Sequence, residues 1–152
     1  MVERTLRPTD PVVAGERYPI EGGTVDARVE VSKTTGGYAL RMLATTAISG
    51  PCSRCLDPAR LDLTIEVREV EQENTDDDEL SSPYIEDGIL DAVAWLHDAI
   101  VLALPDKVLC RPDCAGICPE CGANLNETGP EHTHEAPLDP RFAKLRELQS
   151  ED

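Results

Sequence analysis

Three segments in the first half of the chain are predicted strands, at residues 24–31, 38–48 and 61–68, and apolar and polar side chains alternate in the first and the last of them. A period of two is typical of a strand with one buried face. The sequence Thr34-Thr35-Gly36-Gly37 separates the first two segments and predicts a turn, so residues 24–48 are expected to form a hairpin. The pattern predicts three or more antiparallel strands, preceded over residues 1–23 by an irregular arm with one short strand.

A helical pattern follows at residues 87–104. Asp87 is its predicted N-cap, and Pro105 ends it. Trp95 and His97 flank the apolar stripe and are interpreted as packing or surface residues. The stripe, which repeats at three and four, comprises Ile89, Leu90, Val93, Leu96, Ile100, Val101 and Leu104. The pattern predicts one long amphipathic helix packed on the antiparallel β-sheet, and therefore an α+β fold.

The chain divides into three regions by composition. Residues 1–104 are expected to form the α+β domain, with an acidic loop at residues 71–82 that has nothing to bury. Residues 105–128 form a cysteine-rich segment predicted to bind zinc. Residues 129–152 are a linker followed by a short C-terminal helix that begins at Asp139-Pro140.

The net charge of −16 is concentrated in one stretch of the sequence. Residues 1–68 and 140–152 are each balanced, whereas residues 69–139 hold eighteen acidic side chains against Lys107 and Arg111. Such a stretch repels phosphate backbones and attracts basic proteins, so broad nucleic-acid binding is not expected. Solubility alone also accounts for an acidic excess.

Neither a membrane span nor a signal peptide is expected. No apolar stretch approaches the ~20 residues that cross a bilayer, and the first ten residues, MVERTLRPTD, lack the apolar core of a signal peptide. A cytoplasmic location is therefore expected. Because the cytoplasm keeps thiols reduced, six cysteines there favour metal binding or redox chemistry over disulfides.

The cysteine pattern predicts zinc. Zinc binds four ligands in a tetrahedron, and thiolates suit it. In Cys118-Pro119-Glu120-Cys121-Gly122 two sulfurs come from one bend of chain, and the glycine can adopt the positive φ that lets the chain leave the bend. This stretch predicts a zinc knuckle, and Cys52-Ser53-Arg54-Cys55 is a second, weaker example.

Three ligand sets remain open for a structural zinc ion. The favoured set is local, because ligands close in sequence cost little loop-closure entropy; it comprises Cys110, Cys114, Cys118 and Cys121. The alternative set resembles a zinc ribbon, with one ion clamped between Cys52, Cys55, Cys118 and Cys121. In the third arrangement, six thiolates share more than one ion.

Other chemistry is weakly signalled. His132 and His134 lie in a polar linker, where a surface pair is the favoured interpretation over metal ligation. No nucleophile–base motif, glycine-rich phosphate loop or converging carboxylate pair stands out, so no catalytic residue is predicted and the protein is not expected to be an enzyme.

Four ordered blocks resemble the bacterial YceD family. They are CSRCLDP at residues 52–58, the run ending in IVLALP at residues 89–105, the cysteine-rich stretch from LC to NLN at residues 109–126, and DPRFAKL at residues 139–145. The resemblance spans about residues 45–148. It implies a bacterial, non-enzymatic role in the synthesis, processing or stability of 23S (large-subunit) ribosomal RNA, through large-subunit assembly. Some members keep the first cysteine turn and lack the later four cysteines, which favours the local zinc set.

Resemblance and charge together predict the partner class. A basic ribosomal or assembly protein is favoured over general RNA binding, with no membrane or small-molecule substrate. The candidate RNA or partner contacts are Arg54, Arg60, Arg68, Arg141, Lys144 and Arg146, although a solvated strand face is the favoured interpretation for Arg60 and Arg68. The alternative function is a zinc- or redox-sensing regulator that uses Cys52 and Cys55 as a labile pair.

Overall fold

The three predicted strand segments form neighbouring strands of one antiparallel sheet in the computed structural model, which describes residues 1–72 and 80–134. These strands are β4 (Val25–Lys33), β5 (Gly37–Pro51) and β6 (Pro58–Gln72). β4 pairs with β5, and β5 pairs with β6 along its whole length. The predicted hairpin and the predicted third strand are therefore confirmed, with the second and third strands longer than predicted.

The arm before this sheet is more ordered than its composition predicts. β1 (Val2–Leu6) pairs antiparallel with β4 and completes the sheet order β1-β4-β5-β6. β2 (Val12–Val13) and β3 (Glu16–Arg17) form a small hairpin, and the 3-10 helix η1 spans Glu21–Gly23. The N-terminal residues thus contribute an edge strand to the main sheet.

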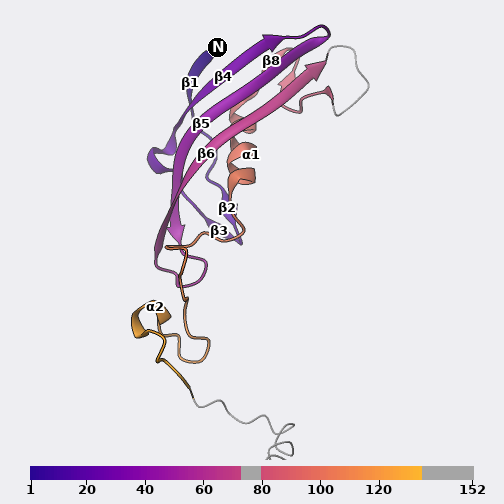
Figure 1. Cartoon of the computed structure of the whole chain (residues 1–152). Helices are drawn as coiled ribbons and strands as arrows, with labels where there is room; N and C mark the ends of the chain where they lie inside the picture. The colour runs from indigo at the N-terminus through magenta and orange to yellow at the C-terminus, as the bar shows by residue number, and fades with distance from the viewer. Residues whose placement is uncertain (73–79, 135–152) are drawn as a thin grey trace, which may run out of the picture. The chain divides into compact units, whose positions relative to one another are not determined.

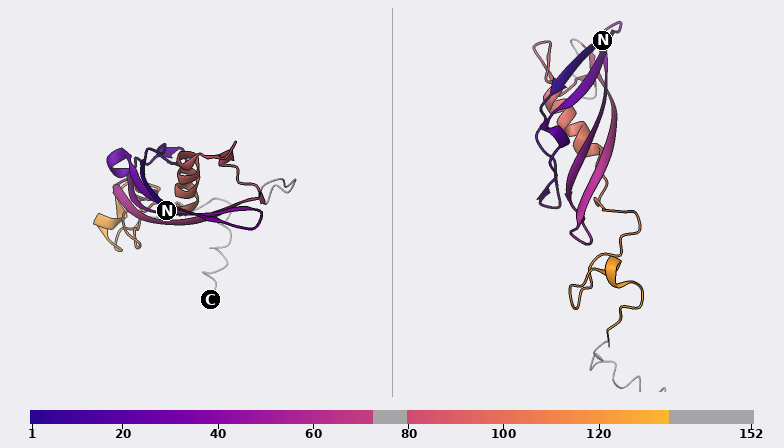
Figure 2. Two further views of the ribbon diagram at one scale, coloured as in Figure 1. Left: turned by 90° about the horizontal axis from the view of Figure 1, so that it is seen from above. Right: turned by 90° about the vertical axis from the view of Figure 1, so that its left-hand side faces the viewer.

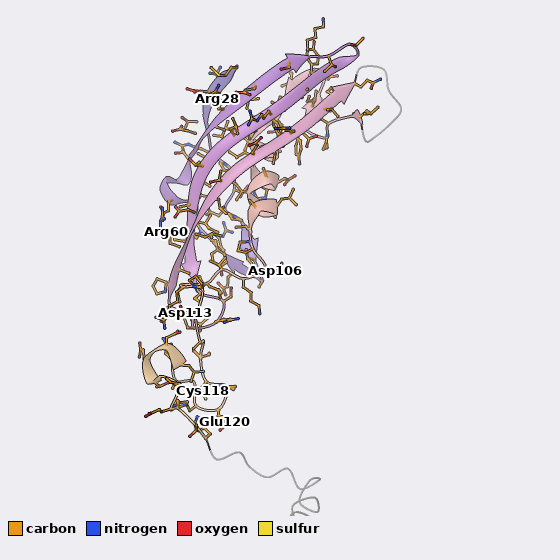
Figure 3. All side chains as sticks on the ribbon, viewed as in Figure 1. Arg28, Arg60, Asp106, Asp113, Cys118 and Glu120 are labelled. Carbon is orange, nitrogen blue, oxygen red and sulfur yellow. The ribbon has the colours of Figure 1, made fainter. Side chains whose placement is uncertain are left out.

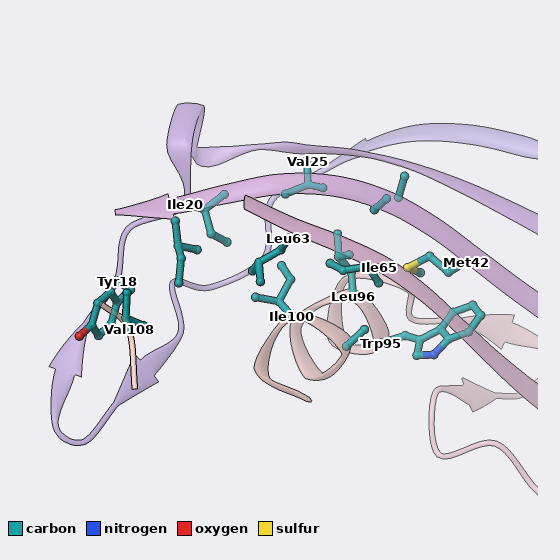
Figure 4. Close-up of a cluster of buried hydrophobic side chains, with 14 of the residues drawn as sticks. Tyr18, Ile20, Val25, Met42, Leu63, Ile65, Trp95, Leu96, Ile100 and Val108 are labelled. Carbon is teal, nitrogen blue, oxygen red and sulfur yellow. The ribbon is translucent and has the colours of Figure 1, made fainter. Parts of the chain in front are cut away.

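The core lies between one face of this sheet and helix α1 (Ala92–Ala103), as Figures 1 and 2 show. The helix buries Trp95, Leu96, Ala99 and Ile100. Figure 4 shows the apolar side chains around them, which are drawn from the N-terminal arm, the strands and the segment after the helix: Tyr18, Ile20, Val25, Met42, Leu63, Ile65 and Val108. Trp95 is therefore a core residue, as the packing interpretation expected.

The predicted start of the helix is wrong. Asp91 is the N-cap, because its carboxylate accepts from the amides of Val93 and Ala94 at 3.1 and 3.0 Å. Asp87 instead lies with Gly88 in a turn between β7 (Ile85–Glu86) and β8 (Ile89–Leu90). Both turn residues have positive φ, 51° and 75°, as a tight hairpin turn requires.

The buried face of the helix is also rotated from the predicted stripe. Leu96 and Ile100 are fully buried as expected, but Val93 and Val101 are 40% and 41% exposed. Trp95 occupies the sheet-facing side in their place and stacks on Tyr84, with ring centroids 6.2 Å apart. The buried side of the helix therefore includes an aromatic ring that lies beside the predicted stripe.

Backbone contacts divide the chain into two units, Met1–Cys114 and the residues from Ala115 onward. The second unit contains the short helix α2 (Leu125–Thr128). The predicted acidic loop begins within β6, and its residues 73–79, like the predicted C-terminal helix from Asp139, lie outside the described residues. In the described part of the chain, no helix is long and apolar enough to cross a membrane.

Candidate metal sites

The first cysteine pair lies in the loop at the end of the long β5–β6 hairpin. The Cys52 amide donates to the Asp57 carbonyl at 2.8 Å, and the Leu56 amide donates to the Cys52 carbonyl at 3.0 Å. The Arg54 amide points back to the Cys52 sulfur at 3.4 Å. This tight turn holds two thiols on one side of the loop, which is the geometry of a metal knuckle.

The chain that follows α1 returns to this loop and brings two more thiols. The Ser53 amide donates to the Val108 carbonyl at 2.8 Å. Two residues later the Cys110 sulfur lies 3.5 Å from the Cys55 sulfur, and the Cys114 sulfur lies 3.7 Å from that of Cys52. All four sulfurs lie within 4.8 Å of one another.

These sulfur separations match a tetrahedral metal site. With Zn–S bonds of ~2.3 Å, tetrahedral geometry places neighbouring sulfurs about 3.8 Å apart. A disulfide would need a sulfur–sulfur distance of ~2.05 Å, and all six cysteines are free. Cys52, Cys55 and Cys114 are buried, and Cys110 is half-buried. We call Cys52, Cys55, Cys110 and Cys114 the four-cysteine cluster.

The thiols of this cluster differ in acidity. Burial raises the pKa of Cys52, but the backbone amides of Arg54 and Cys55 lower it, and the balance is a pKa of about 6. Burial raises the pKa of Cys55 and of Cys110. Several thiolates crowded into a buried space repel one another, and a bound divalent cation offsets that repulsion.

The second knuckle lies in the unit that begins at Ala115. The Cys118 amide donates to the Ala123 carbonyl at 2.8 Å, and the Gly122 amide donates to the Cys118 carbonyl at 2.9 Å. Gly122 has a φ of 73°, which confirms its predicted role in the turn. Amides of Cys121 and Glu120 lower the pKa of Cys118 to about 6, against the effect of burial.

Two histidines complete this second group. After α2, the Nε2 atom of His134 lies 3.2 Å from the Cys118 sulfur, and the Nε2 atom of His132 lies 3.4 Å from the Cys121 sulfur. The two Nε2 atoms are 2.9 Å apart. We call Cys118, Cys121, His132 and His134 the Cys2His2 cluster; Figure 3 labels Cys118.

The structure groups the predicted ligands differently from both four-cysteine sets proposed from the sequence. Cys110 and Cys114 join Cys52 and Cys55, whereas Cys118 and Cys121 join two histidines. The reason is that the sheet and α1 bring residues 52–55 and 108–114 together, so ligands distant in sequence need no separate loop closure. Proximity in the fold therefore differs from proximity in the sequence for these cysteines.

The favoured surface interpretation did not place the histidines beside the cysteines, where the structure has them. One residue separates His132 from His134, whereas three to five residues separate the histidines of common zinc sites. Both rings nevertheless place their Nε2 atoms at the cysteine pair. The sequence feature that could have predicted this grouping is a Cys-x-x-Cys knuckle followed by two nearby histidines, which together offer four potential metal ligands.

The candidate arginines are occupied by contacts within the protein. Arg54 donates to the Cys114 carbonyl at 2.7 Å and so braces the four-cysteine cluster. Arg60, labelled in Figure 3, pairs with Glu21 and Asp62. Arg68 pairs with Glu66 at 3.0 Å. The other candidates, Arg141, Lys144 and Arg146, lie outside the described residues.

Comparison with known proteins identifies the family. The family model of the large ribosomal RNA subunit accumulation protein YceD matches residues 40–149. An uncharacterized protein of Mycobacterium tuberculosis is 33% identical over 135 residues, which cover 84% of this chain and 63% of that protein. A maize protein named large ribosomal RNA subunit accumulation protein YCED homolog 1, chloroplastic, is 29% identical over 153 residues, which cover 72% of this chain and 52% of the maize protein. No solved structure matches.

The chain belongs to the YceD family. The resemblance drawn from the four sequence blocks is therefore confirmed. The chain spans less than two thirds of the length of the relatives above. The matched region contains every residue of both clusters.

Proposed function

We propose that this protein supports the accumulation of 23S (large-subunit) ribosomal RNA by binding a component of large-subunit assembly, and that it catalyses no reaction. The family match carries this proposal. It extends over residues 40–149 and therefore includes most of β5, all of β6, helix α1 and both clusters. The name of the maize relative refers to accumulation of the same RNA.

A basic ribosomal or assembly protein is the proposed partner. The acidic stretch at residues 69–139 carries the whole charge excess and attracts cationic surfaces. Arg68 is paired with Glu66 of the same strand, and Arg60 with Asp62 of that strand and with Glu21 of η1. An RNA phosphate would have to compete with those carboxylates, which supports a protein partner over direct phosphate contact.

Structural zinc in the four-cysteine cluster is proposed to hold this binding domain together. A site of four thiolates is typical of structural zinc, since it leaves no position open for substrate. Cys52 and Cys55 share their cluster with Cys110 and Cys114. That sharing supports a structural role over the alternative of a labile redox pair.

Ribosomal RNA levels test the proposed function. Deleting the coding sequence in the source organism should lower the ratio of large-subunit to small-subunit ribosomal RNA, and the wild-type chain should restore it. An unchanged ratio in the deletion strain would contradict the proposal. Incubating the purified chain with large-subunit RNA fragments tests catalysis, and cleavage or modification that persists at high purity would show an enzyme.

Affinity capture tests the partner class. Tagged protein from growing cells should retain a basic protein after ribonuclease treatment, and raised salt should release it. Neutralising the acids at positions 76–78 should weaken capture, whereas removing three charges from the sheet face, at Glu30, Asp62 and Glu66, should not. Retention of ribosomal RNA alone, lost on ribonuclease treatment, would favour direct RNA binding.

A further inference from the structure

The segment from Ala115 to His134 has very little interior of its own. In this described segment only Gly116 and Cys118 are buried, and α2 buries no side chain. A folded unit this small cannot be held by apolar burial and needs a cross-link such as a disulfide or a metal. Both of its cysteines are free, so a disulfide does not supply that link.

We propose that the Cys2His2 cluster binds its own zinc ion, separate from the zinc of the four-cysteine cluster, and that this ion folds the segment from Ala115 to His134. Two thiolates and two imidazoles make a complete tetrahedral donor set for zinc. The ligands enclose α2 in sequence: the knuckle precedes the helix, and the histidines follow it. An ion bound there closes the segment into one cross-linked loop.

The distances between donor atoms fit this ion. Zn–S bonds of ~2.3 Å and Zn–N bonds of ~2.0 Å predict sulfur–nitrogen separations of about 3.5 Å and a nitrogen–nitrogen separation of about 3.3 Å in a tetrahedron. The two sulfur–nitrogen distances are 3.2 and 3.4 Å, and the nitrogens are 2.9 Å apart. These three separations lie within about 0.4 Å of the tetrahedral values, and all four donor atoms lie within 4.8 Å of one another.

The carboxylate of Glu120 contacts the ring nitrogen of His134 that faces away from the cluster. Glu120 lies between the two cysteines of the knuckle, and its Oε2 atom is 3.4 Å from the Nδ1 atom of His134. Metal-bound histidines commonly donate their second ring N–H to a carboxylate, which fixes the tautomer and the ring orientation. This contact leaves Nε2 facing the cluster.

The two sites should load independently. They share no ligand, and their residues belong to separate units of the chain. The full chain should therefore hold two zinc ions, of which one disappears when the histidines are removed. Because Cys121 and His134 are exposed, whereas three cysteines of the other cluster are buried, a chelator should remove the Cys2His2 ion first.

Zinc content of the full-length protein tests the proposal. Wild-type protein from zinc-supplemented cells should contain two ions per chain by elemental analysis, and the H132A/H134A variant should contain one. His97, the third histidine of the chain, provides the matched control, since its ring contacts the Thr9 carbonyl and neither cluster. H97A should keep two ions. One ion in wild type, or two in H132A/H134A, would overturn the proposal.

Cobalt substitution identifies the ligands. Charge-transfer absorption scales with the number of cobalt–thiolate bonds, so wild type should show the sum of a four-thiolate and a two-thiolate spectrum. H132A/H134A should lose the smaller contribution only. Loss of the four-thiolate contribution in this variant would show that the two sites are not independent and would overturn that part of the proposal.

Local folding is measured separately. Amide hydrogen exchange in residues 115–134 should become fast in H132A/H134A and in chelated wild type. Trp95 is the only tryptophan and a core residue of the other unit. The melting temperature of that unit, followed by the fluorescence of Trp95, should not change. Slow exchange in the metal-free segment would refute the claim that zinc folds it.

Discussion

Replacing Cys110 with serine tests how much the four-cysteine cluster stabilises the main unit. Cys110 is the only half-buried member, so the substitution removes a proposed zinc ligand with less loss of packing than at the three buried cysteines. Serine is close to cysteine in size but is a poor zinc ligand. The variant should therefore report mainly on the metal.

The expected loss of stability follows from the loop that the proposed metal would close. The cluster joins residues 55 and 62 positions apart in the sequence. In the chain-entropy model for disulfides, a cross-link closing a loop of that length stabilises the folded state by about 4 kcal/mol, and we apply the same value to the metal. For a unit of the size of Met1–Cys114, about 1 kcal/mol corresponds to about 4 °C. The Cys110→Ser variant should melt about 15 °C lower.

Thermal unfolding followed by the fluorescence of Trp95 measures this loss, because the indole is 2% exposed in the core of the same unit. A strong chelator should lower the melting temperature of wild type by a similar amount, and it should change the melting temperature of the variant little. Ser53→Ala is the matched control, since Ser53 is an exposed residue between two ligands and should melt like wild type.

Two results would refute the reasoning. If Cys110→Ser kept two zinc ions and the wild-type melting temperature, Cys110 would not be a ligand. If chelated wild type melted at the untreated temperature, the metal would not stabilise this unit, even with correct ligands.

Two further predictions concern the packing that positions the clusters, and both use the same melting assay. Gly50→Ala should lower the free energy of unfolding by about 1–3 kcal/mol, because the added Cβ would lie 2.5 Å from the ring of Tyr18. Gly36→Ala is the control, since the atom nearest to a Cβ there is 3.5 Å away and alanine should be tolerated. Leu96→Ala should lower the free energy of unfolding by about 2–5 kcal/mol, because Leu96 is fully buried. Leu102 is 82% exposed on the same helix, so Leu102→Ala should change the free energy of unfolding by no more than about 0.5 kcal/mol. A stable Gly50→Ala variant, or equal losses at the two leucines, would contradict this packing.

The sheet could be predicted where one face of a strand is buried. In β4, Val25, Ala27 and Val29 are buried, and the residues between them are more exposed, so the sequence itself carries a period of two. The sequence of β1 shows no such alternation of buried and exposed residues. Its residues range from exposed to half-buried along the sheet edge, and its pairing with β4 depends on backbone hydrogen bonds that composition does not encode.

The two knuckles could also be predicted, because each is a local turn. Their partners could not, because pairing depends on the tertiary fold. Loop-closure cost favours neighbours in sequence only while nothing else has brought distant segments together. Here β5, β6 and α1 already hold the hairpin loop beside the segment at Val108, as the Ser53–Val108 hydrogen bond shows. The fold thus selects a ligand set that sequence distance disfavours.

The charged face of the sheet bears on the choice between RNA and protein partners. Glu66 accepts from both Arg41 and Arg68, and these contacts, chiefly the hydrogen bond from Arg41, lower the pKa of Glu66. A phosphate approaching either guanidinium would therefore meet a carboxylate that stays ionised, and displacing it would leave two like charges close together. Arg60 is held in the same way between Glu21 and Asp62. Arginines that are already paired with neighbouring carboxylates offer RNA phosphates less free charge, which supports the proposed cationic protein partner, whose attraction would come from the acidic excess of residues 69–139.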